Sequence, residues 1–183
     1  AHIQVMAPHP LATLTFSGCT VAREALVGNV NGGFKLAMQT LDIFRASVAA
    51  AALGMARRAF AEAVAHAKQR KMFGQTLADF QLTQARLGEM GALIDAAAML
   101  TYRAAWMREK GEGRYAKESA MAKLFASETA VEVSTDGVQV HGGYGYTKDY
   151  PAEKYYRDAK LCTIGEGTSE IQKLVIARDF KRS

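Results

Sequence analysis

The feature that most constrains the fold is a change in hydrophobic period near residue 34. From there, apolar residues recur at steps of three and four, which is the spacing of one face of an α-helix. This spacing predicts a long helix from residue 34 to about residue 70, about 50 Å in length at 1.5 Å per residue. Its expected buried stripe consists of Phe34, Met38, Leu41, Phe44, Val48, Ala52, Met55 and Ala59.

Two further long helices are expected. Gly74 ends the first helix, and Thr76 or Asp79 is suited to cap the next one. The second helix ends at Gly111 and Gly113, and the third spans about Arg114 to Val140. The expected inward residues are Met90, Leu93, Ala97, Leu100, Ala104 and Met107 in the second helix, and Ala120, Leu124, Ser127 and Val131 in the third.

Two shorter helices, residues 153–160 and 169–180, complete the pattern. Long helices joined by short loops predict an all-α fold, an antiparallel up-and-down four-helix bundle. Residues 12–16 and 19–21 instead favour one or two short strands. Because two strands form no stable sheet alone, residues 1–30 are expected to be a short β remnant, the end of a β domain. Residues 31–183 are then the helical domain.

Composition narrows the class of protein. Hydrophobic residues make up 49% of the chain and charged residues 22%, an ordinary globular mixture. No apolar run approaches the roughly 20 residues that span a bilayer, so no membrane span is expected. The net charge of +5 suits a phosphate-bearing ligand, but the basic residues are too scattered for nucleic-acid binding. Two distant cysteines indicate a reducing compartment.

Two glycine-containing segments could hold a ligand. In residues 70–74, Arg70 could cap the helix carbonyls, or it could pair with a phosphate while Phe73 covers an apolar ring. In residues 139–145, glycines would let a ligand approach backbone N–H groups, although such a cluster is also an ordinary turn. His66 and His141 stand apart from other ligand types, so no metal site is expected.

Two further segments carry acidic residues. Glu166 lies between two glycines, just before a helix that Thr168 or Ser169 can cap, with Gln172 completing a capping box from Ser169. Glu166 is either a solvated loop residue or a general base. In residues 42–45, a purely structural interpretation makes Phe44 a core residue and Arg45 a surface cation.

In this order, the segments resemble the C-terminal half of the acyl-CoA dehydrogenase family. The matching motifs are residues 21–28, 33–38, 70–74, 80–81, 139–145, 157–160 and 166–172. The resemblance implies an oxidoreductase of fatty acid metabolism that uses FAD to convert an acyl-CoA thioester to its trans-2-enoyl form. It also implies a homotetramer or homodimer that passes electrons to an electron-transfer flavoprotein, in the bacterial cytoplasm or the mitochondrial matrix.

The resemblance assigns roles to individual residues. Glu166 would remove the α-proton while the β-hydrogen leaves as hydride to the flavin N5. The residues that would contact FAD of a neighbouring subunit are Arg70, Lys71, Met72, Phe73, Gln81, Gln139, Val140, His141, Gly142 and Gly143. Those that would contact FAD of the same subunit are Thr168, Ser169 and Glu170. Those that would line the acyl-CoA site are Asp42, Ile43, Phe44, Arg45 and Gly167.

One branch of the family, acting on isovaleryl-type substrates, places its base on the long helix before the arginine. Here that position is Phe44, which cannot accept a proton, so Glu166 is the candidate base. Two alternatives stay open: an acyl-CoA oxidase, and a non-catalytic helical oligomerisation module. The family's N-terminal helical domain and most of its β domain have no counterpart here, so we expect a fragment that is inactive alone.

Overall fold

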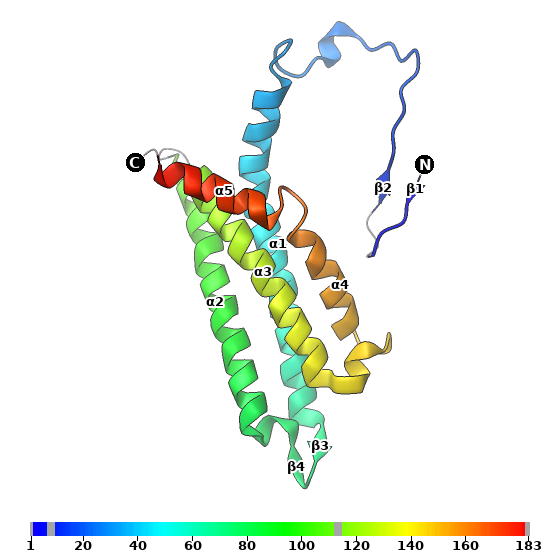
Figure 1. Cartoon of the computed structure of the whole chain (residues 1–183), viewed down its shortest axis with the longest axis vertical. Coiled ribbons are helices and arrows are strands. Elements are labelled where there is room, and N and C mark those ends of the chain that lie inside the picture. The colour runs from blue at the N-terminus through cyan, green and yellow to red at the C-terminus, as the bar shows by residue number, and fades with distance from the viewer. Residues whose placement is uncertain (1, 7–9, 112–114, 182–183) are drawn as a thin grey trace.

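The computed structural model describes residues 2–6, 10–111 and 115–181. Its helices are α1 (Gly33–Gln69), α2 (Gln81–Lys110), α3 (Ala116–His141), α4 (Ala152–Cys162) and α5 (Ser169–Phe180). Helices α1 to α4 run alternately up and down, and α5 lies across one end (Figure 1). The all-α antiparallel bundle is therefore confirmed. Gly113 and Arg114, the expected ends of two helices, lie outside the described residues.

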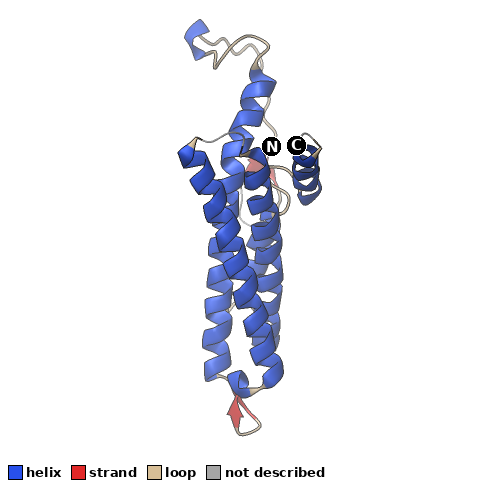
Figure 2. Ribbon diagram, turned by 90° about the vertical axis from the view of Figure 1, so that its left-hand side faces the viewer, coloured by secondary structure: helices blue, strands red, loops and turns tan. Residues whose placement is uncertain are grey.

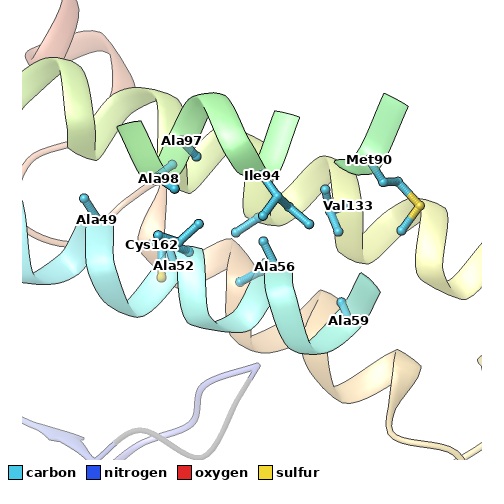
Figure 3. Close-up of a cluster of buried hydrophobic side chains, with 14 of the residues drawn as sticks. Ala49, Ala52, Ala56, Ala59, Met90, Ile94, Ala97, Ala98, Val133 and Cys162 are labelled. Carbon is cyan, nitrogen blue, oxygen red and sulfur yellow. The ribbon is translucent and has the colours of Figure 1, made fainter. Parts of the chain in front are cut away.

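Helix α3 is the centre of the bundle, because it packs against α1, α2, α4 and α5. The core between α1 and its neighbours is built largely from alanines (Figure 3). Opposite them, Gly137 of α3 lies so close to α1 that a Cβ atom on it would be 3.6 Å from the carbonyl oxygen of Ala59. Small side chains thus let the axes of α1 and α3 approach closely. The buried alanines of α1 are Ala49, Ala52, Ala56, Ala59, Ala63 and Ala67.

The predicted stripe on α1 is wrong in its first half. Phe34 is 78% exposed, and Met38 and Phe44 are exposed as well. The reason is that the first turns of α1 extend beyond the other helices, so the described part of the chain leaves much of their surface uncovered (Figures 1 and 2). The buried face begins at Arg45 and continues through the alanines.

The stripes on α2 and α3 are right in part. In α2, Met90, Ala97 and Ala104 are buried as expected, but the face turns toward residues that the pattern missed. Leu93, Leu100, Met107, Leu124 and Val131 are only half-buried. The buried faces of these helices lie about one residue away from the faces predicted from large side chains, because the helices pack through small residues. The missed buried residues of α2 are Ile94, Ala98 and Thr101.

A β-hairpin that the sequence did not predict joins α1 to α2. Strand β3 (Lys71–Met72) pairs with β4 (Gln75–Thr76), and the turn between them uses positive φ at Phe73 (+50°) and Gly74 (+82°). Thr76 and Asp79 form a reciprocal capping box, but it closes the 3-10 turn η2 (Leu77–Asp79) rather than α2. Helix α2 ends, as predicted, at Gly111 in a left-handed conformation.

The N-terminal segment runs beside the bundle rather than within it (Figure 1), and Arg157 of α4 donates to its Met6 carbonyl oxygen at 3.1 Å. Its strands are β1 (His2–Ile3) and β2 (Leu11–Ala12), which pair antiparallel, and a 3-10 turn, η1 (Arg23–Ala25), follows. Of the strands expected at residues 12–16 and 19–21, only Ala12 lies in a strand, β2, within the described structure. β-propensity alone does not make a strand, because strand formation depends on the neighbours against which a segment packs.

By length and composition alone, α1 could cross a membrane, since an 18-residue window of it reaches a mean hydropathy of 1.3. This corrects the expectation that no segment is apolar enough. The alanine face of α1 is nevertheless packed against α2, α3 and α4, and a core helix of a bundle meets the same criterion. One such helix is weak support for a membrane span.

Candidate functional site

The expected site residues lie at two opposite ends of the bundle. Residues 70–73, 81 and 139–143 surround the hairpin end, whereas residues 42–45 and 166–170 lie near α5 (Figure 1). Helix α1 connects the two ends, and the 25 helical steps from Arg45 to Arg70 correspond to about 40 Å. Within one chain, the two groups therefore form separate sites.

At the hairpin end, a hollow of about 560 Å³ brings together segments that are far apart in sequence. The guanidinium carbon of Arg70 lies 5.6 Å from the ring centroid of Tyr144, a cation–π contact. The Arg70 backbone N–H donates to the carbonyl of His66 and ends α1. The expected site residues that line this hollow are Arg70, Met72, Val140, His141, Gly142 and Gly143.

The same hollow contains a pair of stacked histidines. The rings of His66 and His141 lie 4.3 Å apart, with Tyr144 and Tyr150 at their edges. The Nδ1 atom of His141 lies 2.7 Å from the Gly137 carbonyl oxygen. Burial lowers the pKa of His66, and His141 and Arg70 lower it further. Among residues 2–6, 10–111 and 115–181, no three metal-ligating side chains gather.

Other members of this group point elsewhere. Phe73 is 89% exposed at the hairpin tip, and Lys71 and Gln81 are exposed too. Gln139 lines a different hollow, of about 500 Å³, together with Arg157 of α4. The structure therefore gathers six of the ten expected residues around one hollow and leaves four outside it.

At the other end, Arg45 is only 5% exposed and forms an ion pair of 2.6 Å with Asp42. This reverses the purely structural interpretation, because Phe44 is the exposed residue and Arg45 the buried one. Arg45 is in register with the alanine face of α1, and Asp42 offsets its charge. Both line a hollow of about 220 Å³ with Lys117 and Arg178. Ile43 lies on another face, between α1 and α2.

The loop between α4 and α5 holds Glu166 in an unusual conformation, with φ of +56°, followed by Gly167 at +94°. Gln172 Nε2 donates to the carbonyls of Glu166 (3.1 Å) and Gly167 (2.9 Å). Lys123 Nζ donates to the same Gly167 carbonyl at 2.7 Å. We call these two side chains the loop clamp.

The loop clamp determines where the backbone donors of this loop point. In a trans peptide the C=O and N–H point in opposite directions, so the N–H groups of Gly167 and Thr168 face away from the buried donors. Within the described part of the chain, nothing accepts from the N–H groups of Glu166, Gly167 or Thr168. The half-buried Glu166 therefore adjoins three free backbone donors.

The predicted capping box at α5 is wrong in one respect. Thr168 is the N-cap, and its hydroxyl accepts from the Ile171 N–H at 3.5 Å. Gln172 does not reach back to the cap, because it is fully buried beneath the loop, where a Cβ atom on Gly167 would lie 2.8 Å from its Nε2. Thr168, Ser169 and Glu170 line a hollow of about 390 Å³.

Sequence reasoning missed Lys123 and the true role of Gln172. The available signal was position: Lys123 lies three residues after Ala120 and four before Ser127, both expected to face inward. A lysine on the apolar face of a helix requires a buried partner. Here that partner is a loop carbonyl 44 residues further along the chain.

The family model for the C-terminal domain of acyl-CoA dehydrogenases matches residues 31–180. The chain belongs to the acyl-CoA dehydrogenase family. This confirms the resemblance inferred from the motif order, and the acyl-CoA dehydrogenase homologues are FAD flavoproteins.

Individual acyl-CoA dehydrogenase relatives are similar over nearly the whole chain. The mitochondrial short-chain specific acyl-CoA dehydrogenase of Mus musculus is 46% identical over 172 residues, 94% of this chain and 42% of that protein. The 3-(aryl)acrylate reductase of Clostridium sporogenes is 45% identical over 171 residues, 93% of this chain and 45% of that protein. Butyryl-CoA dehydrogenase from Megasphaera elsdenii superposes with a TM-score of 0.95 at 40% identity, covering 98% of this chain and 47% of that one. The chain thus spans less than half the length of these relatives.

Proposed function

We propose that the enzyme carrying these residues uses FAD to oxidise an acyl-CoA thioester to its trans-2-enoyl form, with Glu166 as the base. The observation that carries the proposal is the α4–α5 loop. It presents a carboxylate and three free backbone N–H groups side by side, in a conformation imposed by the loop clamp. A base beside hydrogen-bond donors is what α-proton removal from a thioester requires.

The chemistry of the loop follows from the substrate. The α-proton of a thioester is weakly acidic, so the negative charge that develops on the thioester oxygen must be stabilised as the proton leaves. The Glu166 N–H supplies a donor for that oxygen while the Glu166 carboxylate takes the proton. The electron pair left at the α-carbon forms the double bond as the β-hydrogen departs with its two electrons. FAD, when bound, supplies the acceptor for this hydride.

The residues at the hairpin end fit a dinucleotide. Gly142 and Gly143 are exposed, and a Cβ atom on either would meet no atom within 4 Å, so a ligand has room to approach the backbone. Arg70 adds a cation at the same hollow, suited to the pyrophosphate. Met72, Val140 and His141 line the same hollow. The proposed contacts of FAD beyond the hollow are Lys71, Phe73, Gln81 and Gln139.

The second half of the proposed FAD site is Thr168, Ser169 and Glu170 at the opposite end of the bundle. The separation of about 40 Å along α1 supports a cofactor shared between two copies of the chain, in a homodimer or homotetramer. The acyl-CoA site is proposed at Asp42, Ile43, Phe44, Arg45 and Gly167, where Lys117 and Arg178 add positive charge beside the Arg45–Asp42 pair. Because two of the compared relatives are named for short-chain and butyryl substrates, butyryl-CoA is the first substrate to test.

The test is anaerobic reduction of bound FAD by butyryl-CoA, followed in the visible spectrum. Bleaching is expected for the unmodified enzyme. Glu166→Gln is expected to keep FAD bound but slow bleaching by about 10²–10⁴-fold, the usual contribution of a general base. Glu89→Gln, on an exposed face of α2, is the matched control and should bleach normally. Unchanged bleaching in Glu166→Gln would show that Glu166 is not the base and would favour another site.

A second candidate is the reverse reaction, reduction of an unsaturated acyl group. The name of the Clostridium sporogenes relative, 3-(aryl)acrylate reductase, favours this candidate. Glu166 would then return a proton to the α-carbon. Adding cinnamoyl-CoA to the reduced enzyme tests this candidate, because re-oxidation of the flavin much faster with cinnamoyl-CoA than with crotonyl-CoA would show a preference for arylacrylate groups. Rapid re-oxidation by air would instead indicate an oxidase, whereas re-oxidation by an electron-transfer flavoprotein would support the proposed dehydrogenase.

A further inference from the structure

A lysine is buried directly behind the proposed catalytic loop. Lys123 of α3 has 0% of its surface exposed, and its Nζ donates to the Gly167 carbonyl at 2.7 Å. Burial lowers the pKa of this amine, and Arg45 lowers it as well, while Glu128, Glu166 and the thiol of Cys162 act in the opposite direction. A lysine is almost never fully buried without a partner, and this one is directed at a backbone carbonyl.

The burial of Lys123 is weak evidence for a role in stability. Replacing a buried charged group by an apolar side chain of similar volume is often neutral or stabilising, so a lysine here is poorly explained by folding alone. What it does explain is the conformation of the loop. Glu166 has a left-handed φ, which a residue other than glycine adopts only where its surroundings hold it.

Two donors from two helices converge on one atom. Lys123 comes from α3 and Gln172 from α5, and both hydrogen-bond the Gly167 carbonyl. Gln172 also holds the preceding carbonyl, that of Glu166. Together they fix two successive peptide planes, and with them the direction of the Gly167 and Thr168 N–H groups.

We propose that Lys123 is a positioning residue for the reaction: through the Gly167 carbonyl it holds Glu166 in its left-handed conformation. The carboxylate and the Glu166 N–H then face the same bound thioester. The effect on catalysis rests on the proposed function, whereas the effect on the loop is a property of this chain.

The test uses Lys123→Met, which keeps the length of the side chain and removes the ammonium group. In the full 183-residue chain without substrate, hydrogen exchange is measured at the Ser169 amide, whose bond to the Thr163 carbonyl closes the loop. We expect exchange at least about tenfold faster as the loop opens. In the FAD-loaded enzyme, kcat with butyryl-CoA should fall about 10²-fold, because small misplacements of reacting groups cost that much, with little change in KM.

The matched control is Lys173→Met, an exposed lysine next to Gln172 in sequence, which should leave exchange, kcat and KM unchanged. If Lys123 were purely structural, Lys123→Met would lower Tm without a selective fall in kcat relative to KM. That pattern would overturn the proposal. Unchanged exchange at Ser169 would overturn it too, whether or not the enzyme oxidises acyl-CoA. If the unmodified enzyme oxidises no acyl-CoA, the proposed function fails, and the exchange result still decides whether Lys123 holds the loop.

Gln172→Met provides a second route if Lys123→Met does not fold. It removes the other donor to the same carbonyl and should open the loop in the same way. In a double-mutant cycle, the effects of the two substitutions on kcat should be coupled, because both act through one acceptor. Multiplicative, independent effects would show that Lys123 does not act through Gly167.

Discussion

Gly167 shows at the level of a single residue how tightly the α4–α5 loop is built. Its φ is +94°, and a Cβ atom there would lie 2.8 Å from Gln172 Nε2. We expect Gly167→Ala to destabilise the chain by more than about 1 kcal/mol, because alanine is strained at this φ and displaces the clamp. Gly165→Ala is the control: its Cβ would lie 3.5 Å from the Leu161 carbonyl oxygen, an ordinary contact. Urea unfolding of both variants checks this, and equal losses would contradict it.

The stacked histidines should make stability depend on pH. Because burial and neighbouring groups lower the pKa of His66, the folded chain binds fewer protons there than the unfolded chain. The unfolding free energy should then be higher above pH 6.5, the ordinary pKa of histidine, and fall as the pH drops below it. His66→Gln should flatten the dependence of Tm on pH between 7.5 and 5.5, a range around that value. His2→Gln, in the exposed N-terminal strand, should leave the slope unchanged.

Elements were predicted better than the faces through which they pack. The five helices follow from period and glycine punctuation, and α5 spans the same residues in sequence pattern and in structure. The packing face of α1 did not follow, because the pattern weighted large residues such as Phe34 over the alanines that pack against α3. The β3–β4 hairpin was missed because its strands have two residues each, too few to show alternation.

The contact between α1 and α3 permits a sharp test. At Gly137, a Cβ atom would lie 3.6 Å from the Ala59 oxygen and 3.9 Å from its Cβ, which leaves room for a methyl group but not for more. Gly137→Ala should therefore be neutral or stabilising by up to about 1 kcal/mol, through its higher helix propensity. Gly137→Leu should destabilise by about 1–3 kcal/mol from overpacking. Chemical denaturation measures both, and a stable leucine variant would argue against so close an approach.

At the scale of the whole molecule, the two groups of site residues predict complementation between subunits. Arg70→Ala and Glu166→Gln should each inactivate the enzyme when present in every subunit. In a mixed oligomer whose cofactor sites are shared between two copies, some sites combine an intact Arg70 with an intact Glu166. Random mixing of equal amounts should restore about a quarter of the unmodified activity in a symmetric pair. Zero restored activity after verified subunit exchange would indicate that each chain completes its own site.

The sequence predicted a candidate site residue only where its neighbours in the chain indicate its role. Glu166 between glycines and Arg70 at the end of a helix can be recognised from neighbours in the chain. Lys123 and the stacking of His66 on His141 cannot, because each depends on a contact between residues many positions apart. The motif order supplied the family, which no single motif could have done.

The alanine face of α1 has a mechanical consequence. Alanine has no side-chain rotamer to change, so a displacement arriving at this contact cannot be absorbed by local repacking. Helices α1 and α3 should move together as one rigid body. A tilt imposed at the hairpin should therefore displace the Glu166 loop by a similar angle. In an assembly, binding at one end of a chain would then be felt, as a rigid displacement, at the other.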